Sequence, residues 1–317
     1  MKVIDHIRQA KDTLFTIEIL PPKKGENINA LFSHIDSLMD YNPAFIDVTY
    51  HREEHVYQEQ GDGTLKKQVV RKRPGTVGIC AAIQNRYQVD TVPHVICGGF
   101  SKEDTENMLI DLDFLGIENV LVLRGDPVKS EQGFKPHAEG HGYASELIEQ
   151  VSRMNRGIYL DASQEAATPT DFCIGAAGYP EKHFESPNPD TDLRYLKQKV
   201  DAGAEFVVTQ MFFDNQVYFD FVERCRSYGI NVPIIPGLKP LATKGHLTAL
   251  PKHFFLDIPD DLAQAVSKCV DNKAAREVGV EWCVQQCREL KEHGVPCLHF
   301  YTMSKSELVG RVAKAVF

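Results

Sequence analysis

The sequence has an ordinary globular composition and a net negative charge. Of its 317 residues, 43% are hydrophobic and 25% are charged, which excludes a disordered or fibrous protein. The formal charge of −9 argues against a nucleic-acid-binding protein, because phosphate binding usually requires a basic domain.

Charges interrupt the N-terminal segment 1–8, so this segment lacks the apolar core of a secretory signal. No run of about 18 apolar residues that could cross a membrane occurs in the sequence. We therefore expect a cytoplasmic protein that binds neither membranes nor nucleic acids. The eight cysteines include no Cys-x-x-Cys pair, and we expect them to be reduced core residues. Cys283 and Cys287 lie on one predicted helix without matching Cys or His spacing elsewhere, so no metal site is predicted.

Short β-rich runs alternate with longer segments of helical periodicity. The runs cover residues 15–20, 45–49, 91–96, 120–123, 172–176, 206–209, 234–235 and 297–301. Between the first two, the apolar residues from Ile28 to Met39 fall on one helical face, as a helix that covers a sheet requires. This alternation predicts a parallel sheet. With eight strands we predict an α/β protein whose residues 1–317 form one (β/α)8 TIM-barrel catalytic domain; an open doubly wound sheet is the alternative.

Four joints between a helix and the next strand repeat one pattern, in which a glycine precedes an apolar residue. They begin at Gly116, Gly203, Gly229 and Gly294. Glycine readily adopts the left-handed conformation that ends a helix, and the apolar residue leads into a buried strand. We expect each of these glycines to end a helix.

Two long segments interrupt the alternation. Residues 51–75 form a charged insertion in which Gly61-Asp62-Gly63 predicts a hairpin turn, and residues 127–143 are rich in glycine, proline and charges. Both are expected at the carboxyl ends of the strands, where the loops of such barrels form the active site. The 51–75 insertion would either cover the site or mediate assembly.

Polar side chains stand at the ends of most predicted strands. Glu18 lies among apolar residues, so an inward-facing carboxyl there would be partly desolvated, with a raised pKa suited to proton donation. An exposed or ion-paired structural glutamate is the alternative. Arg124 and Asp126 flank a glycine turn and either pair with each other or belong to a site.

Three further residues have polar groups on or after predicted strands. For His94 a site role and a hydrogen-bonded core role both stay open, whereas His299 is expected in the core. Gln210 offers a donor and an acceptor, which suits a heterocycle with amide-like edges. Gly140-His141-Gly142 lacks both a preceding strand and the third glycine of a dinucleotide fingerprint, so a nucleotide cofactor must be bound in another way.

Taken together, these blocks resemble the methylenetetrahydrofolate reductase family, in the bacterial type that consists of the catalytic barrel. The match runs in order from Phe15 to about Glu307. Its most specific blocks are Leu123-Arg124-Gly125-Asp126 and Thr209-Gln210-Met211-Phe212-Phe213-Asp214, and others are Ile17-Glu18-Ile19-Leu20-Pro21-Pro22, Val48-Thr49-Tyr50, Pro93-His94 and Tyr179-Pro180-Glu181.

The resemblance implies a flavoprotein that uses NADH or NADPH to reduce 5,10-methylenetetrahydrofolate to 5-methyltetrahydrofolate, which supplies methyl groups for methionine synthesis. It implies non-covalent FAD, held by the loops at the strand ends. By motif match, the FAD would be lined by Thr49, Tyr50, His94, Arg124, Gly125, Asp126, Tyr143, Ala144, Tyr179, His183, Asp192 and Lys199.

The resemblance also implies how folate is handled. Gln210 would hold the pterin, Asp126 would serve both flavin and folate, and Glu18 would be the general acid that helps to open the five-membered ring. Leu250 stands where many relatives carry phenylalanine against the substrate. Lys305 stands where an arginine often meets the folate tail, and a lysine can pair with a carboxylate there but not in a bidentate fork. The family also suggests a homo-oligomer, while the choice between NADH and NADPH stays open.

Two other functions stay open. A lyase or aldolase barrel would use Lys239 as a Schiff-base amine. A partner-dependent subunit without its own flavin would share the fold but receive electrons from another protein.

Overall fold

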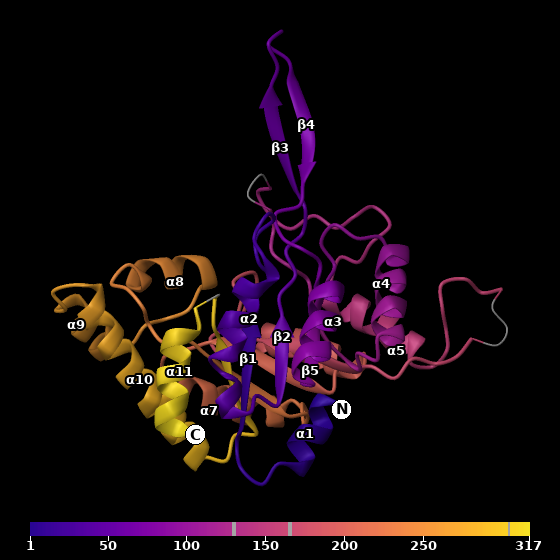
Figure 1. Ribbon diagram of the computed structural model, residues 1–317. Helices are drawn as coiled ribbons and strands as arrows, with labels where there is room; N and C mark the ends of the chain where they lie inside the picture. Colours follow the sequence, from indigo (N-terminus) through magenta and orange to yellow (C-terminus); the bar gives the residue numbers. More distant parts are fainter. Residues whose placement is uncertain (129–130, 164–166, 304) are drawn as a thin grey trace.

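The strands close into a barrel (Figure 1). The computed structural model describes residues 1–128, 131–163, 167–303 and 305–317, in which eight parallel strands follow the order β1-β10-β9-β8-β7-β6-β5-β2. They are β1 (Leu14–Ile19), β2 (Phe45–Val48), β5 (Asp90–Ile96), β6 (Asn119–Leu123), β7 (Cys173–Gly178), β8 (Phe206–Met211), β9 (Ile234–Leu238) and β10 (Cys297–Tyr301). Because β1 pairs with both β10 and β2, the sheet has no open edge. The predicted (β/α)8 barrel and all eight strands are confirmed, and the open-sheet alternative is wrong.

Helices cover the outside of this barrel. Those that connect successive strands are α2 (Ile28–Asp36), α3 (Thr76–Tyr87), α4 (Lys102–Phe114), α5 (Ala144–Met154), α6 (Pro189–Asp201), α7 (Asn215–Ser227) and α10 (Asn272–Glu292), while α11 (Ser306–Val316) follows the last strand. Two short helices, α8 (His246–Phe254) and α9 (Asp260–Ser267), precede α10, and η1 (Met39–Tyr41) is a single 3₁₀ turn. Within the described residues, no helix is long and apolar enough to cross a membrane.

The four predicted glycine joints all have the left-handed backbone conformation. Their φ angles are 69° at Gly116, 125° at Gly203, 74° at Gly229 and 72° at Gly294. Side chains other than glycine rarely adopt such angles, so glycine at these positions ends the helix and turns the chain back toward the sheet. The repeated pattern in the sequence therefore encodes the repeat of the fold.

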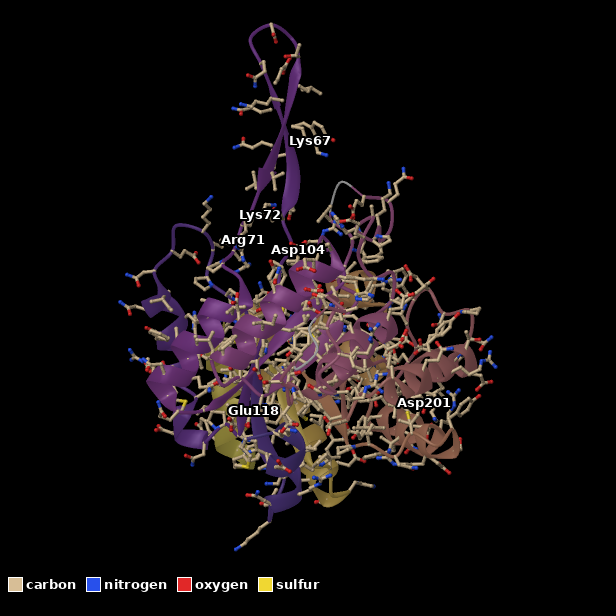
Figure 2. All side chains as sticks on the ribbon, turned by 90° about the vertical axis from the view of Figure 1, so that its right-hand side faces the viewer. Lys67, Arg71, Lys72, Asp104, Glu118 and Asp201 are labelled. Atoms are coloured by element: carbon tan, nitrogen blue, oxygen red, sulfur yellow. The ribbon has the colours of Figure 1, made fainter. Side chains whose placement is uncertain are left out.

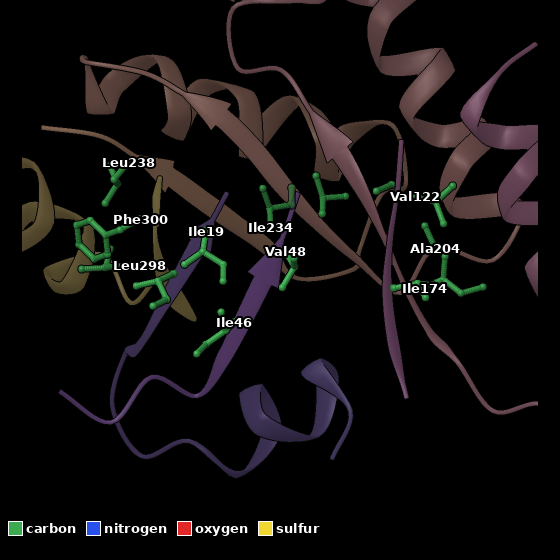
Figure 3. Packing of buried hydrophobic residues seen from close by; sticks show 14 of the residues in the cluster. Ile19, Ile46, Val48, Val122, Ile174, Ala204, Ile234, Leu238, Leu298 and Phe300 are labelled. Atoms are coloured by element: carbon green, nitrogen blue, oxygen red, sulfur yellow. The ribbon is translucent and has the colours of Figure 1, made fainter. Parts of the chain in front are cut away.

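Alternation along each strand separates two apolar clusters. Outward-facing residues such as Ile46, Val122 and Phe300 pack beneath the helices (Figure 3). Inward-facing residues of the lower barrel, including Phe45 and Phe206, form a second cluster. That cluster also contains residues of the helix α1 (Val3–Gln9), which lies at the end of the barrel away from the hairpin (Figure 1). Apolar side chains therefore fill the barrel interior at the end where α1 lies.

The 51–75 insertion is a hairpin, as the sequence predicts. Its strands β3 (Glu54–Glu59) and β4 (Leu65–Val70) pair antiparallel and project away from the barrel, with Lys67 on the hairpin and Arg71 and Lys72 near its base (Figures 1 and 2). The turn is closed by a hydrogen bond of 2.8 Å from the Gln60 amide to the Thr64 carbonyl.

Gly279 and Gly78 both lie inside helices but differ in the space around them. A Cβ at Gly279 in α10 would lie 2.1 Å from the carbonyl oxygen of Leu241, whereas a Cβ at Gly78 in α3 would meet nothing within 4 Å. We expect Gly279→Ala to lower the free energy of unfolding by about 1–3 kcal/mol, because two backbone segments must move apart. Gly78→Ala should raise it by about 0.5–1 kcal/mol, because alanine has the higher helix propensity. Urea unfolding measures both changes, and equal effects would contradict the close approach at Gly279.

Candidate active site

Many of the residues predicted to hold the cofactor meet in one cavity at the carboxyl ends of β6 and β7. The cavity has a volume of about 580 Å³ and reaches between the helices α5 and α6. Seven of the predicted residues line it: Arg124, Tyr143, Ala144, Tyr179, His183, Asp192 and Lys199. Its volume is within the usual range for small-molecule and cofactor pockets.

Arg124 follows β6 and points toward the α6 side of this cavity. Its guanidinium donates a hydrogen bond of 2.6 Å to Glu185 and lies 4.9 Å from the centroid of the Phe134 ring. Among the described residues, the ion pair of Arg124 is with Glu185 and not with Asp126. The predicted alternative, an ion pair between Arg124 and Asp126, is therefore wrong.

The turn after Arg124 depends on glycine. Gly125 has a φ of 85°, and a Cβ at this position would approach Ile96 to 3.3 Å. The turn leaves Asp126 exposed. The hydroxyl of Tyr179 has a pKa raised first by burial and then by the negative charge of Asp126, so the two side chains lie near each other.

Lys199 is a partly buried cation of the cavity. Its Nζ donates a hydrogen bond of 2.9 Å to the Ala177 carbonyl, and burial lowers the pKa of the ammonium to about 8. The Tyr179 ring centroid lies 5.8 Å from this Nζ and 4.8 Å from the His183 ring. Cations beside flat rings fit a dinucleotide, because its diphosphate requires positive charge and its ring systems require flat apolar partners.

Asp192 and Ala144 complete the cavity wall from the starts of two helices. The Asp192 carboxylate, in the first turn of α6, accepts a hydrogen bond of 2.7 Å from the Ser186 hydroxyl. Ala144 is the first residue of α5, and Tyr143, immediately before it, is 63% exposed. Tyr143 is therefore accessible to a bound molecule.

Glu18 stands at the end of β1, next to His94 of β5 and Asp47 of β2. The His94 Nε2 lies 3.5 Å from Glu18 Oε2 and 3.7 Å from Asp47 Oδ2. Burial raises the pKa of Glu18 to about 7, with His94 and Lys239 lowering it and Asp47 raising it further. The inward, desolvated carboxyl predicted from the sequence is confirmed, and its pKa suits a proton donor near neutral pH.

Further polar residues share the barrel interior with Glu18. Asp47 is completely buried, and neither of its carboxyl oxygens has a hydrogen-bond partner in the described structure. Burial raises the pKa of Asp47 to about 7, while His299 lowers it. The Nδ1 of His299 lies 3.0 Å from the Thr16 hydroxyl, which confirms His299 as a hydrogen-bonded core residue. Burial lowers the pKa of both His94 and His299.

Thr49 and Tyr50 come directly after β2. The Thr49 amide donates a hydrogen bond of 3.1 Å to the Ile19 carbonyl, which fixes it beside the end of β1. The Tyr50 ring lies 5.2 Å from Phe100 and lines a second cavity of about 970 Å³ at the base of the hairpin. Tyr50 is thus placed apart from the seven residues that line the first cavity.

The predicted folate residues lie around β8, β9 and β10. The Gln210 side-chain oxygen accepts a hydrogen bond of 2.9 Å from the Met211 amide. Leu250 of α8 is buried in an apolar cluster with Met211. Lys305 is exposed at the start of α11, and its charge adds to the burial that lowers the pKa of Lys239 to about 8, which Glu18 opposes.

The family model described as methylenetetrahydrofolate reductase matches residues 2–316. The chain belongs to this family. It is 32% identical over 317 residues to methylenetetrahydrofolate reductase (NADH) 1 of Arabidopsis thaliana, covering 96% of this chain and 49% of that protein. It is 30% identical over 294 residues to the 5,10-methylenetetrahydrofolate reductase of Escherichia coli, covering 92% of this chain and 87% of that protein. The chain thus spans about half the length of the plant relative and most of the bacterial one.

A solved structure has the same fold. An uncharacterized protein from Clostridium thermocellum, described as binding two copies of 5-methyl-5,6,7,8-tetrahydrofolic acid, superposes with a TM-score of 0.58 at 17% identity. The superposition covers 99% of this chain and 98% of that one.

Asp47 is not among the site residues predicted from the sequence of this reductase-family barrel. The sequence feature that marks Asp47 is its position as a carboxylate within the otherwise apolar run Phe45-Ile46-Asp47-Val48. Alternate residues of a strand share a face, so Asp47 points inward with Phe45. A carboxylate at such a position must lie in the barrel interior.

The raised pKa of Glu18 makes stability depend on pH. The folded protein keeps this proton up to about pH 7, whereas the pKa of an ordinary glutamate carboxyl is near 4.5. Between these values the unfolded state binds fewer protons, so rising pH favours unfolding. Relative to the wild type, the non-ionising variant Glu18→Gln should gain stability across this window, on the order of a few kcal/mol, and gain no more above it. Urea unfolding at a series of pH values tests this, and a difference that is constant with pH would rule out a buried neutral carboxyl.

Proposed function

We propose that this chain is a catalytic barrel that reduces 5,10-methylenetetrahydrofolate to 5-methyltetrahydrofolate, with non-covalent FAD as cofactor and NADH or NADPH as reductant. Membership of the methylenetetrahydrofolate reductase family supports this proposal, and its relatives include reductases named for NADH and for NADPH. The observation that carries it is Glu18, a carboxyl whose raised pKa keeps it protonated near neutral pH inside the barrel. The product would supply methyl groups for methionine synthesis.

The cavity between α5 and α6 is the proposed place for part of the FAD. Arg124 and Lys199 would supply the positive charge that a diphosphate requires, and Tyr179 and His183 would offer flat ring surfaces. Thr49, Tyr50, His94 and Gly125 would contact the cofactor outside this cavity. When bound, FAD supplies a hydride carrier between the pyridine nucleotide and the methylene carbon of the folate.

Glu18 would supply the proton of the folate reaction. The amine nitrogen of the five-membered ring leaves poorly unless it is protonated, so a neutral carboxylic acid is the group required. The proton moves from the Glu18 carboxyl to that nitrogen as its bond to the methylene carbon breaks. A pKa near 7 keeps the acid protonated at working pH without making it too weak to donate.

The other proposed residues orient the substrates. Asp126 would hold a negative charge beside the flavin, which disfavours extra electrons there and promotes hydride release. Gln210 would bind the amide-like edge of the pterin, while Leu250 and Lys305 would contact the rest of the folate. We also propose a homo-oligomer, following the family.

The direct test is the absorption spectrum of the purified protein. We expect a yellow protein whose flavin band is lost on adding NADH or NADPH and returns on adding 5,10-methylenetetrahydrofolate, because both substrates react at one cofactor. Acid or heat should release the FAD, because no covalent bond holds it. A colourless protein that cannot be reconstituted with FAD would overturn the proposal.

The variant Glu18→Gln separates the two half-reactions. Flavin reduction by the pyridine nucleotide needs no proton from Glu18 and should remain near the wild-type rate. Flavin reoxidation by 5,10-methylenetetrahydrofolate should fall by roughly 10²–10⁴-fold, which is typical of the loss of a positioned general acid. Stopped-flow absorbance measures both steps.

A matched control for this variant is Glu181→Gln. Burial also raises the pKa of Glu181 to about 7, but its carboxyl accepts a hydrogen bond of 3.0 Å from the Asp257 amide, away from His94. Equal losses of reoxidation in the two variants would remove Glu18 from the mechanism.

A second candidate function is suggested by Lys239. Burial lowers the pKa of its ammonium to about 8, which favours the neutral amine that a Schiff-base lyase requires. Borohydride trapping of a carbonyl compound on Lys239 would support this function. The third alternative, a subunit that depends on a partner for electrons, predicts no activity of the purified chain with NADH or NADPH.

A further inference from the structure

Two carboxyl groups of the barrel interior lie side by side. Glu18 of β1 and Asp47 of β2 are direct partners in the register of these parallel strands. Partners in a parallel pair point to the same face of the sheet, and here that face is the barrel interior. The register therefore holds both carboxyls close together wherever the barrel is intact.

One imidazole nitrogen lies between the two carboxyls. The Nε2 of His94 is 3.5 Å from a Glu18 oxygen and 3.7 Å from an Asp47 oxygen, and it has no hydrogen-bond partner within the described structure. A proton on this nitrogen can face either carboxyl. His94 therefore links the two acids electrostatically.

The two acids differ in their exposure. Glu18 keeps 13% of its side-chain surface exposed, whereas Asp47 is completely buried and its oxygens are unpartnered. An unpaired buried carboxylate is costly, and the residues around Asp47 provide no hydrogen bond that would explain its presence as a structural group. Asp47 therefore calls for a role beyond packing.

We propose that Asp47 is a positioning residue for Glu18: through the His94 nitrogen between them, it keeps on Glu18 the proton that is delivered to the substrate. This inference rests on the proposed folate reduction. Two carboxyls that share a buried site cannot both ionise cheaply, so the pair holds one proton in common. Because Glu18 is the member with access to the barrel mouth, the shared proton leaves through Glu18.

Other titratable groups face this pair and must be counted. Those near Glu18, besides His94 and Asp47, are Lys239 and Tyr301, and those near Asp47 are His299, Cys80, Cys297 and Tyr301. Lys239 favours an ionised Glu18, and His299 favours an ionised Asp47. Burial raises the pKa of Tyr301, Cys80 and Cys297, so these groups stay neutral near pH 7. The two carboxyls, the two histidines and Lys239, whose pKa burial lowers to about 8, are thus the groups that change charge with pH.

The variant Asp47→Asn tests the inference in the FAD-loaded protein. The pH midpoint of flavin reoxidation by 5,10-methylenetetrahydrofolate should move down by about one pH unit, because Glu18 then ionises without a neighbouring carboxylate. At pH 8 this shift means a rate about tenfold lower, while the rate at low pH and flavin reduction by NADH or NADPH stay near the wild type. A merely structural role would lower the rate at every pH without moving the midpoint.

The matched control is Asp90→Asn. Asp90 also pairs with a histidine, at 2.7 Å from His6 Nε2, but it is the first residue of β5 and lies at the amino end of that strand. This variant should leave the reoxidation midpoint unchanged. If Asp47→Asn does not fold, Asp47→Ser removes the same charge from a smaller side chain and carries the same expectation.

An infrared titration keeps this inference separate from the proposed function. Without any substrate, and after subtraction of the band of Glu181 with the help of Glu181→Gln, because burial raises the pKa of Glu181 to about 7 too, the band of protonated carboxyl groups in the oxidised protein should show Glu18 and Asp47 losing their protons in two coupled steps. Asp47→Asn should remove one and lower the midpoint of the other, which Glu18→Gln then identifies. If the wild type fails to reoxidise with the folate but this infrared shift occurs, the proposed function falls and the coupling stands. If the Glu18 midpoint is the same with and without the Asp47 carboxyl, the inference is overturned.

Discussion

Closure of the sheet is the constraint on which the rest of this structure depends. A parallel strand has two faces, and in a closed barrel every inward side chain must share a narrow interior with those of the other strands. The apolar cluster around Phe45 and Phe206 fills the lower part of that interior. These side chains close the interior at the amino ends of the strands. A polar group nearer the carboxyl ends of the strands can therefore be solvated only from that open end of the barrel.

The electrostatics of the upper barrel follow from this geometry. Glu18 lies nearest the mouth, and Asp47 lies beside it with no exposed surface. Burial is the largest cause of the shift for both carboxyls and for His94, raising the pKa of the acids and lowering that of the base. These shifts favour a neutral interior near pH 7. Burial in the barrel interior favours the neutral form of the carboxylic acid. A carboxyl group exposed on the outer surface of the barrel would lack this burial and would be ionised near pH 7.

Local sequence patterns predicted the repeat of the fold well. Buried parallel strands appear as short apolar runs, and glycines such as Gly116 and Gly229 mark the helix ends because their positive φ angles exclude most side chains. The hairpin turn at Gly61-Asp62-Gly63 was also readable, since its geometry depends on adjacent residues. The register of neighbouring strands could not be predicted from the sequence. The pairing of Glu18 with Asp47 depends on how β1 is staggered against β2, and no local pattern encodes that stagger.

Assembly of the site was predictable only in part, for the same reason. Seven of the predicted cofactor residues meet in one cavity because they follow neighbouring strands, β6 and β7, or lie on the helices that flank that cavity. Tyr50 follows β2, and the chain continues there into the hairpin, so its ring packs on Phe100 and lines a different cavity. A motif identifies a residue type, whereas the direction of its loop depends on packing that the motif does not contain.

Glu18 and the cavity between α5 and α6 lie on different parts of the barrel. Glu18 is held by strand register inside the barrel, while Arg124 and Lys199 are held by the loop after β6 and by α6. In the order of the strands, β2 and β5 lie between β1, which carries Glu18, and β6, which Arg124 follows. A change at Glu18 can therefore alter proton transfer without disturbing the cavity. Conversely, the loops around the cavity can vary in sequence without changing the dry interior that keeps the acid protonated. Strand register thus fixes Glu18, whereas a loop and α6 fix Arg124 and Lys199, so different parts of the fold hold the two groups in place.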